Sequence, residues 1–187
     1  MKQKILVVVD MQNDFVDGAL GSEDAQGIID NVIREIKSNE YSKIYVTLDS
    51  HNPDYLNTYE GKNLPVVHCI KGTDGWKMNS KVYRALKDSI KTDKTIDDKI
   101  AFYEKNGFGS FVLVNRINSE INNIESVTLV GLCTDICVMV NALMLRGKFP
   151  NLPIYYVEDA CAATSKEKQD SSIKIFESCQ IYPKPQL

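Results

Sequence analysis

The sequence predicts an α/β fold in which helices cover both faces of a mostly parallel sheet. Two observations lead to this prediction. Short apolar runs of strand length alternate along the chain with longer patterns of helical period. The apolar runs are also nearly continuous, which is typical of strands buried on both faces. With 187 residues the chain is long enough for one domain and short for two, so we expect residues 1–187 to form a single domain.

Four apolar runs are predicted strands. They span residues 5–9, 43–48, 127–130 and 154–157. The first run ends at Asp10, the second at Asp49 and the last at Glu158 and Asp159. Ligands of open α/β sheets bind beyond the carboxyl ends of the strands, so we expect Asp10 and Asp49 to line one crevice. The alternative interpretation is that such an Asp merely starts a turn or caps a helix.

Helical patterns of apolar residues fill the segments between the strands. They cover residues 28–36, 82–90, 136–145 and 173–176. Thr134 is the expected N-cap of the third pattern, which closes at Arg146 and Gly147. The run Thr-Ser-Lys-Glu at residues 164–167 resembles a capping box and predicts the start of the last helix.

Composition narrows the classes of function. The chain is 43% hydrophobic with a net charge of −3 and no Lys/Arg cluster, which argues against nucleic acid and anionic membranes as partners. No apolar run approaches the roughly 20 residues of a membrane span. Five cysteines at irregular spacing favour free thiols in a cytoplasmic protein over a disulfide framework. They are Cys69, Cys133, Cys137, Cys161 and Cys179.

Cys137 lies in the turn between the predicted strand 127–130 and the helix that follows it. With Thr134 as N-cap it is the third helical residue, above unpaired N–H groups and the positive end of the helix dipole. Both features favour the thiolate over the thiol. The sequence therefore predicts that Cys137 is a nucleophile at the carboxyl edge of the sheet.

A thiol nucleophile needs a base or a cation nearby. Asp10 is the carboxylate expected at the same crevice, and Lys105 offers a cation within the aromatic-flanked segment 101–111. In such a group Asp10 takes the thiol proton while Lys105 favours both anions. Taken alone, Lys105 is typical of a surface charge, and no spacing in the sequence brings the three side chains together.

The segment 50–76 is long and contains both histidines of the chain, and loops of such length are usually functional or disordered. Asp49 and His51 are two residues apart, so they point to one side of an extended chain. With His68 they form a suitable ligand set for zinc, iron or manganese, and Glu60 is a further ligand directly or through water. The alternative interpretation is that both histidines are ordinary hydrogen-bonding residues.

Four segments in order along the chain resemble the motifs of the isochorismatase-like cysteine hydrolases, and of the nicotinamidases within that group. They are VVDMQNDF at 8–15, DSH at 49–51 with HCIKGTDG at 68–75, Lys105 with Phe108 and Phe111, and GLCTDICV at 131–138. The resemblance extends from residue 5 to about residue 163. It implies a three-layer α-β-α fold with a mostly parallel, six-stranded sheet.

The same resemblance implies a catalytic triad of Asp10, Lys105 and Cys137. It also implies a cis peptide bond between Leu132 and Cys133. That bond aims the N–H of Cys133, beside the N–H of Cys137, at a developing oxyanion.

A divalent ion is implied as cofactor, with zinc preferred and iron or manganese as alternatives. Its ligands are Asp49, His51 and His68, with Glu60 as a fourth. The chain departs from nicotinamidases at residues 64–67, which read LPVV and lack the aromatic that commonly precedes the histidine. The wall of the substrate site is then expected from other residues. They are Phe15, Phe108, Trp76 and Leu132.

The implied activity is hydrolysis of a small amide, nicotinamide, by an enzyme whose relatives are often homo-oligomers. The nearest alternative is another small-amide or ureido hydrolase of the same superfamily. A true isochorismatase, which cleaves a vinyl ether, needs neither the cysteine nor the metal loop. A redox module on Cys133 and Cys137 is disfavoured because three residues rather than two separate the thiols. A silent binding domain is disfavoured because every expected site residue is present.

Overall fold

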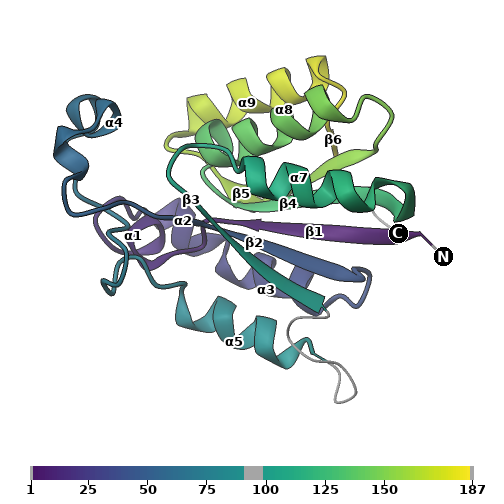
Figure 1. The fold of residues 1–187 in the computed structure, drawn as a ribbon, viewed down its shortest axis with the longest axis horizontal. Helices are drawn as coiled ribbons and strands as arrows, with labels where there is room; N and C mark the ends of the chain where they lie inside the picture. The colour runs from purple at the N-terminus through teal and green to yellow at the C-terminus, as the bar shows by residue number, and fades with distance from the viewer. Residues whose placement is uncertain (1, 91–98, 186–187) are drawn as a thin grey trace.

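Residues 2–90 and 99–185 are described by the computed structural model of the chain. In this part of the chain six strands form one sheet, in the order β3-β2-β1-β4-β5-β6, with every neighbouring pair parallel (Figure 1). The strands are β1 (Gln3–Val9), β2 (Lys43–Asp49), β3 (Ile100–Lys105), β4 (Ile124–Leu132), β5 (Ile154–Ala162) and β6 (Tyr182–Pro183). The predicted α/β class and the six-stranded parallel sheet are confirmed.

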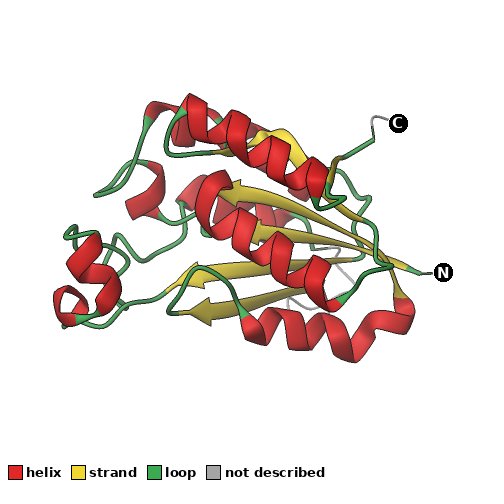
Figure 2. Ribbon diagram, turned by 90° about the horizontal axis from the view of Figure 1, so that it is seen from above, coloured by secondary structure: helices red, strands yellow, loops and turns green. Residues whose placement is uncertain are grey.

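Helices cover both faces of the sheet (Figure 2). One face carries α1 (Asn13–Val16), α2 (Glu23–Gly27), α3 (Ile29–Lys37) and α5 (Ser80–Asp88), and the other carries α7 (Phe111–Glu120), α8 (Met139–Lys148) and α9 (Lys166–Ser178). Side chains of β1 alternate between the two cores, with Leu6 and Val8 toward α3 and with Ile5, Val7 and Val9 toward α8. The result is the expected three-layer architecture.

The order of the strands creates a topological switch point at one edge of the sheet, and we call the region beyond the strand ends there the crevice. From β1 the chain builds β2 and β3 outward on one side, and β4 begins again on the other side of β1. The connections that leave β1 and β4 therefore diverge, and ligands of open α/β sheets bind at such a switch point. A short helix, α4 (Tyr59–Asn63), projects beyond the same edge of the sheet (Figure 1).

Two predicted boundaries are wrong. β5 does not end at Glu158 and Asp159 but continues to Ala162. A bulge interrupts its pairing with β4: Tyr156 pairs with Leu129 and Cys161 pairs with Gly131, and the four residues of β5 between these two pairs are not paired with β4. The N-cap of α9 is Ser165 rather than Thr164, since the Ser165 hydroxyl accepts the N–H of Lys168. The predicted helices 28–36 and 82–90 correspond to α3 and α5 within about two residues, the usual uncertainty of helix ends.

β3 was not predicted as a strand. It lies at the edge of the sheet and pairs only with β2. Its two end residues are buried, and the four between them alternate between partly buried and exposed, with Phe102 40% exposed. The short apolar run IAFY at residues 100–103 was interpreted only as part of the aromatic-flanked segment around Lys105 and not as a strand.

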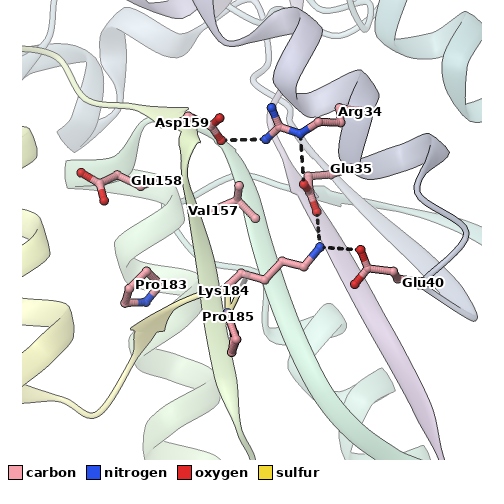
Figure 3. A pocket seen from close by; sticks show the side chains of 9 residues that line it. All are labelled: Arg34, Glu35, Glu40, Val157, Glu158, Asp159, Pro183, Lys184 and Pro185. Atoms are coloured by element: carbon pink, nitrogen blue, oxygen red, sulfur yellow. Dashed lines mark hydrogen bonds and ion pairs between the residues drawn. The ribbon is translucent and has the colours of Figure 1, made fainter. Parts of the chain in front are cut away.

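The last described residues pack against α3 around one buried carboxylate. Lys184 lies between Glu35 and Glu40, with Nζ–O distances of 2.8 and 2.9 Å (Figure 3). The hydroxyl of Tyr41 donates to the same Glu35 oxygen at 2.9 Å. These interactions hold the segment after β6 against α3.

All five cysteines are free, as predicted, and Cys69 and Cys161 are buried whereas Cys179 is partly exposed. Within residues 2–90 and 99–185 we find no helix with the length and apolar character needed to cross a bilayer.

Gly131 is the point at which β4 passes closest to β1, and it provides a test of the fold. Its φ is +115°, and a Cβ there would lie 2.1 Å from the carbonyl oxygen of Val9. We expect Gly131→Ala to lower the free energy of unfolding by more than about 2 kcal/mol in urea titrations. The control Gly147→Ala, on α8 with open space around it, is expected to raise that free energy by about 0.4–1 kcal/mol. Equal midpoints for the two variants would contradict this account of Gly131.

Candidate active site

The crevice brings together a carboxylate, an ammonium and a thiol from three separate segments. Asp10 follows β1, Lys105 ends β3 and Cys137 lies in the turn after β4. Nζ of Lys105 lies 2.7 Å from Oδ2 of Asp10 and 3.5 Å from Sγ of Cys137. The same ammonium is 3.2 Å from Oδ1 of Asp49. All four side chains are buried, so they interact in a medium that screens charge weakly.

Burial and charge together set the protonation of this group. Burial tends to lower the pKa of Lys105, but the neighbouring Asp10, Cys137 and Asp49 raise it above its ordinary value, so the ammonium stays charged. Burial raises the pKa of Asp10, against the attraction of Lys105. Burial likewise raises the pKa of Cys137 well above its ordinary value, and Asp10 adds to this while Lys105 opposes it.

The expected thiolate is therefore wrong for the free site. Cys137 is only 6% exposed, and the loss of water outweighs the contribution of the helix end on which the expectation relied. Burial thus favours the protonated thiol over the thiolate. A buried carboxyl whose pKa is raised is also well matched to accept that proton during a reaction.

The turn that carries Cys137 is a π-helical turn, η3 (Thr134–Val138), and α8 begins only at Met139. The N–H of Val138 donates to the carbonyl of Cys133, five residues back, at 3.1 Å. Cys133 is therefore the N-cap, and the prediction of Thr134 in that position is wrong. Turns of this type are frequent at functional sites. The peptide bond between Leu132 and Cys133 is cis, as the family resemblance implies.

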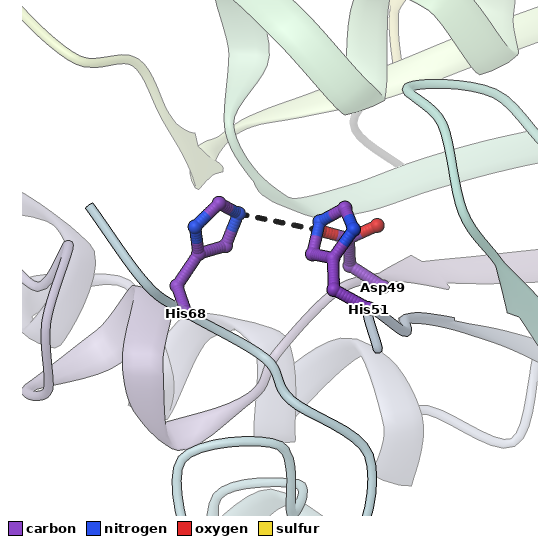
Figure 4. Close-up of side chains that lie close together, drawn as sticks. All are labelled: Asp49, His51 and His68. Carbon is purple, nitrogen blue, oxygen red and sulfur yellow. Dashed lines mark ion pairs between the residues drawn. The ribbon is translucent and has the colours of Figure 1, made fainter. Parts of the chain in front are cut away.

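Asp49, His51 and His68 converge in the same crevice (Figure 4). Nε2 of His51 lies 2.8 Å and Nε2 of His68 3.6 Å from Oδ2 of Asp49, and one ligand atom of each residue lies within 4.8 Å of the others. Oε1 of Glu60 is 3.8 Å from Nε2 of His51.

The donor set fits a divalent metal ion. Nδ1 of His68 lies 2.8 Å from the carbonyl of Val66, which can only accept, so in the neutral imidazole this nitrogen carries the proton and Nε2 presents a lone pair. Nε2 of His51 is buried and makes no hydrogen bond, although it lies 2.8 Å from Oδ2 of Asp49. Two imidazole nitrogens and one carboxylate oxygen suit zinc, iron or manganese.

Tyr55 holds the two histidines and was not predicted. Its ring centroid lies 4.6 Å from that of His51 and 4.9 Å from that of His68. Its hydroxyl donates to the carbonyl of Leu64 at 3.0 Å, which ties the segment carrying α4 and Glu60 back onto the crevice. Tyr55 thus restrains both imidazole rings and the base of the projecting segment.

The four residues expected to form the substrate wall lie in different surroundings. The ring of Phe15 packs 5.5 Å from that of His68. The indole N–H of Trp76 donates to Oγ of Ser50 at 2.8 Å. Phe108 is 48% exposed on the loop after β3, whereas Leu132 is buried in the core shared with α3 and α5. The side chain of Leu132 is thus occupied in packing.

Gln12 is a further residue of the site and was not predicted. Its Oε1 accepts the N–H of Asp49 at 2.7 Å, and its Nε2 donates to the carbonyls of Asp49 and Trp76, each at 2.8 Å. Gln12 therefore bonds both backbone polar groups of Asp49. Thr47 orients the carboxylate of Asp10 in a similar way, by donating to Oδ1 at 2.7 Å. The N-terminal motif contains Gln12, so the family signature was the available signal.

The three-layer fold, with its six-stranded parallel sheet, and the buried site are those of a hydrolase. Residues 4–183 match the family model of the isochorismatase domain, and the chain belongs to the isochorismatase family.

Relatives and solved structures agree with this assignment. The chain is 24% identical to the nicotinamidase of Schizosaccharomyces pombe, over 94% of this chain and 90% of that protein. The structure of nicotinamidase/pyrazinamidase PncA from Bacillus subtilis is similar with a TM-score of 0.81 at 23% identity, covering 97% and 100% of the two chains. The pyrazinamidase of Pyrococcus horikoshii in complex with zinc has a TM-score of 0.75 at 24% identity, covering 98% and 99%.

The hydrogen bonds of Gln12 predict a large effect of its replacement. Gln12→Leu leaves two buried backbone groups of Asp49 and the partly buried carbonyl of Trp76 without their partner, at a cost of about 1–3 kcal/mol for each buried group. We expect the free energy of unfolding to fall by about 3 kcal/mol or more in urea titrations. Gln26→Leu, an exposed position on α2, serves as control and is expected to change it by less than about 0.5 kcal/mol. Similar values for the two variants would refute the role given to Gln12.

Proposed function

We propose that the enzyme is a nicotinamidase, an amidohydrolase that converts nicotinamide to nicotinate and ammonia and also accepts pyrazinamide. The observation that carries the proposal is the contact of the Lys105 ammonium with Asp10, with Cys137 and with Asp49 of the histidine cluster. One buried cation thus joins a candidate nucleophile and base to a candidate metal site. The similarity to the fission-yeast nicotinamidase and to PncA supports the choice of substrate.

In the proposed first step, Asp10 removes the proton from Sγ of Cys137 and the sulfur attacks the carboxamide carbon. A C–S bond forms, and the carbonyl electrons move to oxygen. The backbone N–H groups of Cys133 and Cys137 are the proposed donors to this oxyanion. Asp10 then returns the proton to the nitrogen, the C–N bond breaks and ammonia leaves a thioester behind.

In the proposed second step, Asp10 takes a proton from water, and the resulting hydroxide attacks the thioester carbon. The C–S bond breaks, Asp10 passes its proton to Sγ of Cys137, and the carboxylic acid formed loses its proton to solvent and leaves as nicotinate. Lys105 stabilises the anionic forms of both Asp10 and Cys137 throughout, at 2.7 and 3.5 Å. Thr47 keeps the base directed into the crevice.

Asp49, His51 and His68 are the proposed ligands of a divalent ion, with Glu60 as a fourth ligand. When bound, the ion supplies a Lewis-acidic position for the ring nitrogen of the substrate. The proposed wall for that ring is Phe15, which packs on His68, together with Trp76 and Phe108.

The proposed nucleophile gives the most direct test. We expect Cys137→Ala to reduce ammonia release from nicotinamide at least about a thousandfold, because no other group in the mechanism can form the covalent bond. Cys179→Ala, which removes a partly exposed thiol near the end of α9, is the control and is expected to retain activity. Normal turnover of nicotinamide by the Cys137→Ala variant would contradict the proposal.

Removal of the metal gives a second test. We expect treatment with a chelator to abolish ammonia release from nicotinamide, and one added equivalent of zinc, manganese or ferrous ion to restore it. Metal analysis is expected to give one ion per chain in the native enzyme and a much smaller amount in His68→Ala. Full activity in protein shown to be free of metal would rule out this ligand set as a functional centre.

A second candidate function is hydrolysis of another small amide or ureido compound by the same residues. Val67 precedes His68 where nicotinamidases commonly carry an aromatic, and it is partly exposed to solvent. A panel of nicotinamide, pyrazinamide and ureido substrates distinguishes the two candidates. Nicotinamide as the slowest substrate of the panel would select the second.

A further inference from the structure

Lys105 and Cys137 come from segments that are not neighbours in the sheet. β3 and β4 are separated by β2 and β1, so their backbones lie roughly 14 Å apart at about 4.8 Å per strand. The pairing of strands alone does not fix the position of the loop that follows Lys105 relative to the nucleophile turn, which is the turn that carries Cys137. The 3.5 Å contact between Nζ and Sγ therefore needs a connection across the crevice.

The side chain of Asn141 makes such a connection. It lies on α8, four residues after Cys137, and is 0% exposed. Nδ2 donates to the carbonyl of Cys137 at 2.8 Å and to the carbonyl of Phe108 at 3.3 Å. Oδ1 accepts the N–H of Ser110 at 3.0 Å. One amide group thus bonds both the nucleophile turn and the loop that follows Lys105.

The loop is also packed directly against α8. A Cβ on Gly109 would lie 2.3 Å from Sδ of Met144 and 2.8 Å from Cγ1 of Val140, so the loop backbone touches the helix. Ser110 caps α7 by accepting the N–H of Leu113 at 3.2 Å. The loop is therefore fixed at α7 and at Asn141.

We propose that Asn141 is a positioning residue, which locks the loop after β3 onto the nucleophile turn and thereby holds the Lys105 ammonium against the Cys137 thiol. A primary amide offers two donors and an acceptor on one short side chain, which is what two carbonyls and one N–H require. Asn141 touches no reacting atom and acts only through Lys105. The inference rests on the roles proposed for Lys105 and Cys137 but not on the identity of the substrate.

Two substitutions separate the parts of the connection. Asn141→Leu removes all three hydrogen bonds. Asn141→Ser retains a hydroxyl that can donate to the Cys137 carbonyl four residues back, but it is too short to reach Phe108 and Ser110. If Asn141→Leu does not fold, Asn141→Ser still tests the link to the loop.

The measurement is the rate at which iodoacetamide alkylates Cys137 in the full-length protein, followed by mass spectrometry of the peptide that contains it. This readout needs no substrate, so it is independent of whether nicotinamide is hydrolysed. We expect both Asn141 variants to slow alkylation roughly tenfold, the factor that corresponds to one pKa unit of the thiol. Lys105→Met is expected to slow it at least as much.

The double variants decide whether Asn141 acts through Lys105. In the Lys105→Met background, Asn141→Ser is expected to cause no further slowing, because the group that it positions is gone. Leu145→Ala, a core truncation one turn further along α8, controls for loss of stability and is expected to leave the alkylation rate within twofold of the parent.

Three results would overturn the inference. They are an unchanged rate in both Asn141 variants, a full additional effect of Asn141→Ser in the Lys105→Met background, and equal slowing by Leu145→Ala at a similar melting temperature. A failure of nicotinamide hydrolysis with the expected alkylation rates would refute the proposed substrate and leave the role of Asn141 intact.

Discussion

The contact that the site depends on is the buried ammonium of Lys105. An ammonium removed from water is costly unless it is paired and hydrogen-bonded, and this one faces Asp10 at 2.7 Å and Asp49 at 3.2 Å. Each carboxylate in turn is buried and gains from the same cation. Loss of the lysine would leave both carboxylates in the interior without their cation, and loss of either carboxylate would remove one of the two partners of the ammonium. The free energy needed to leave a buried charge unpaired therefore keeps Lys105, Asp10 and Asp49 together.

The topology explains why these side chains can meet. Asp10, Asp49 and Lys105 lie at or just beyond the carboxyl ends of β1, β2 and β3, which are neighbours in the sheet. Cys137 approaches from β4, on the other side of the switch point. The parallel register therefore places three of the groups along one edge of the sheet, beside the change of winding direction at which open α/β sheets bind their ligands.

Much of the fold and the residue types of the site could be predicted from the sequence, because inner strands and strand-end carboxylates leave local patterns. Three features left no such pattern and could not be predicted. The strand β3, which carries Lys105, is defined by its pairing with β2 at the edge of the sheet. The π-helical turn is defined by the hydrogen bond from the N–H of Val138 to the carbonyl of Cys133, and no spacing of residue types in the sequence predicts that bond. The raised pKa of Cys137 follows from burial, whereas the local sequence showed only a helix end.

Two of the residues to which the sequence analysis assigned no role share one property. Gln12 and Asn141 are buried amides whose partners are backbone groups of distant segments, 37 residues away at Asp49 and 31 residues away at Ser110. A parallel sheet fixes each strand relative to its neighbours but leaves the loops beyond the strand ends unpaired. A short side-chain amide can donate and accept at the same time, so it makes the hydrogen bonds in those loops that a neighbouring strand makes within the sheet. Sequence patterns reveal such a residue only through its motif, because its chemistry is determined by the carbonyls and N–H groups that the fold brings to it.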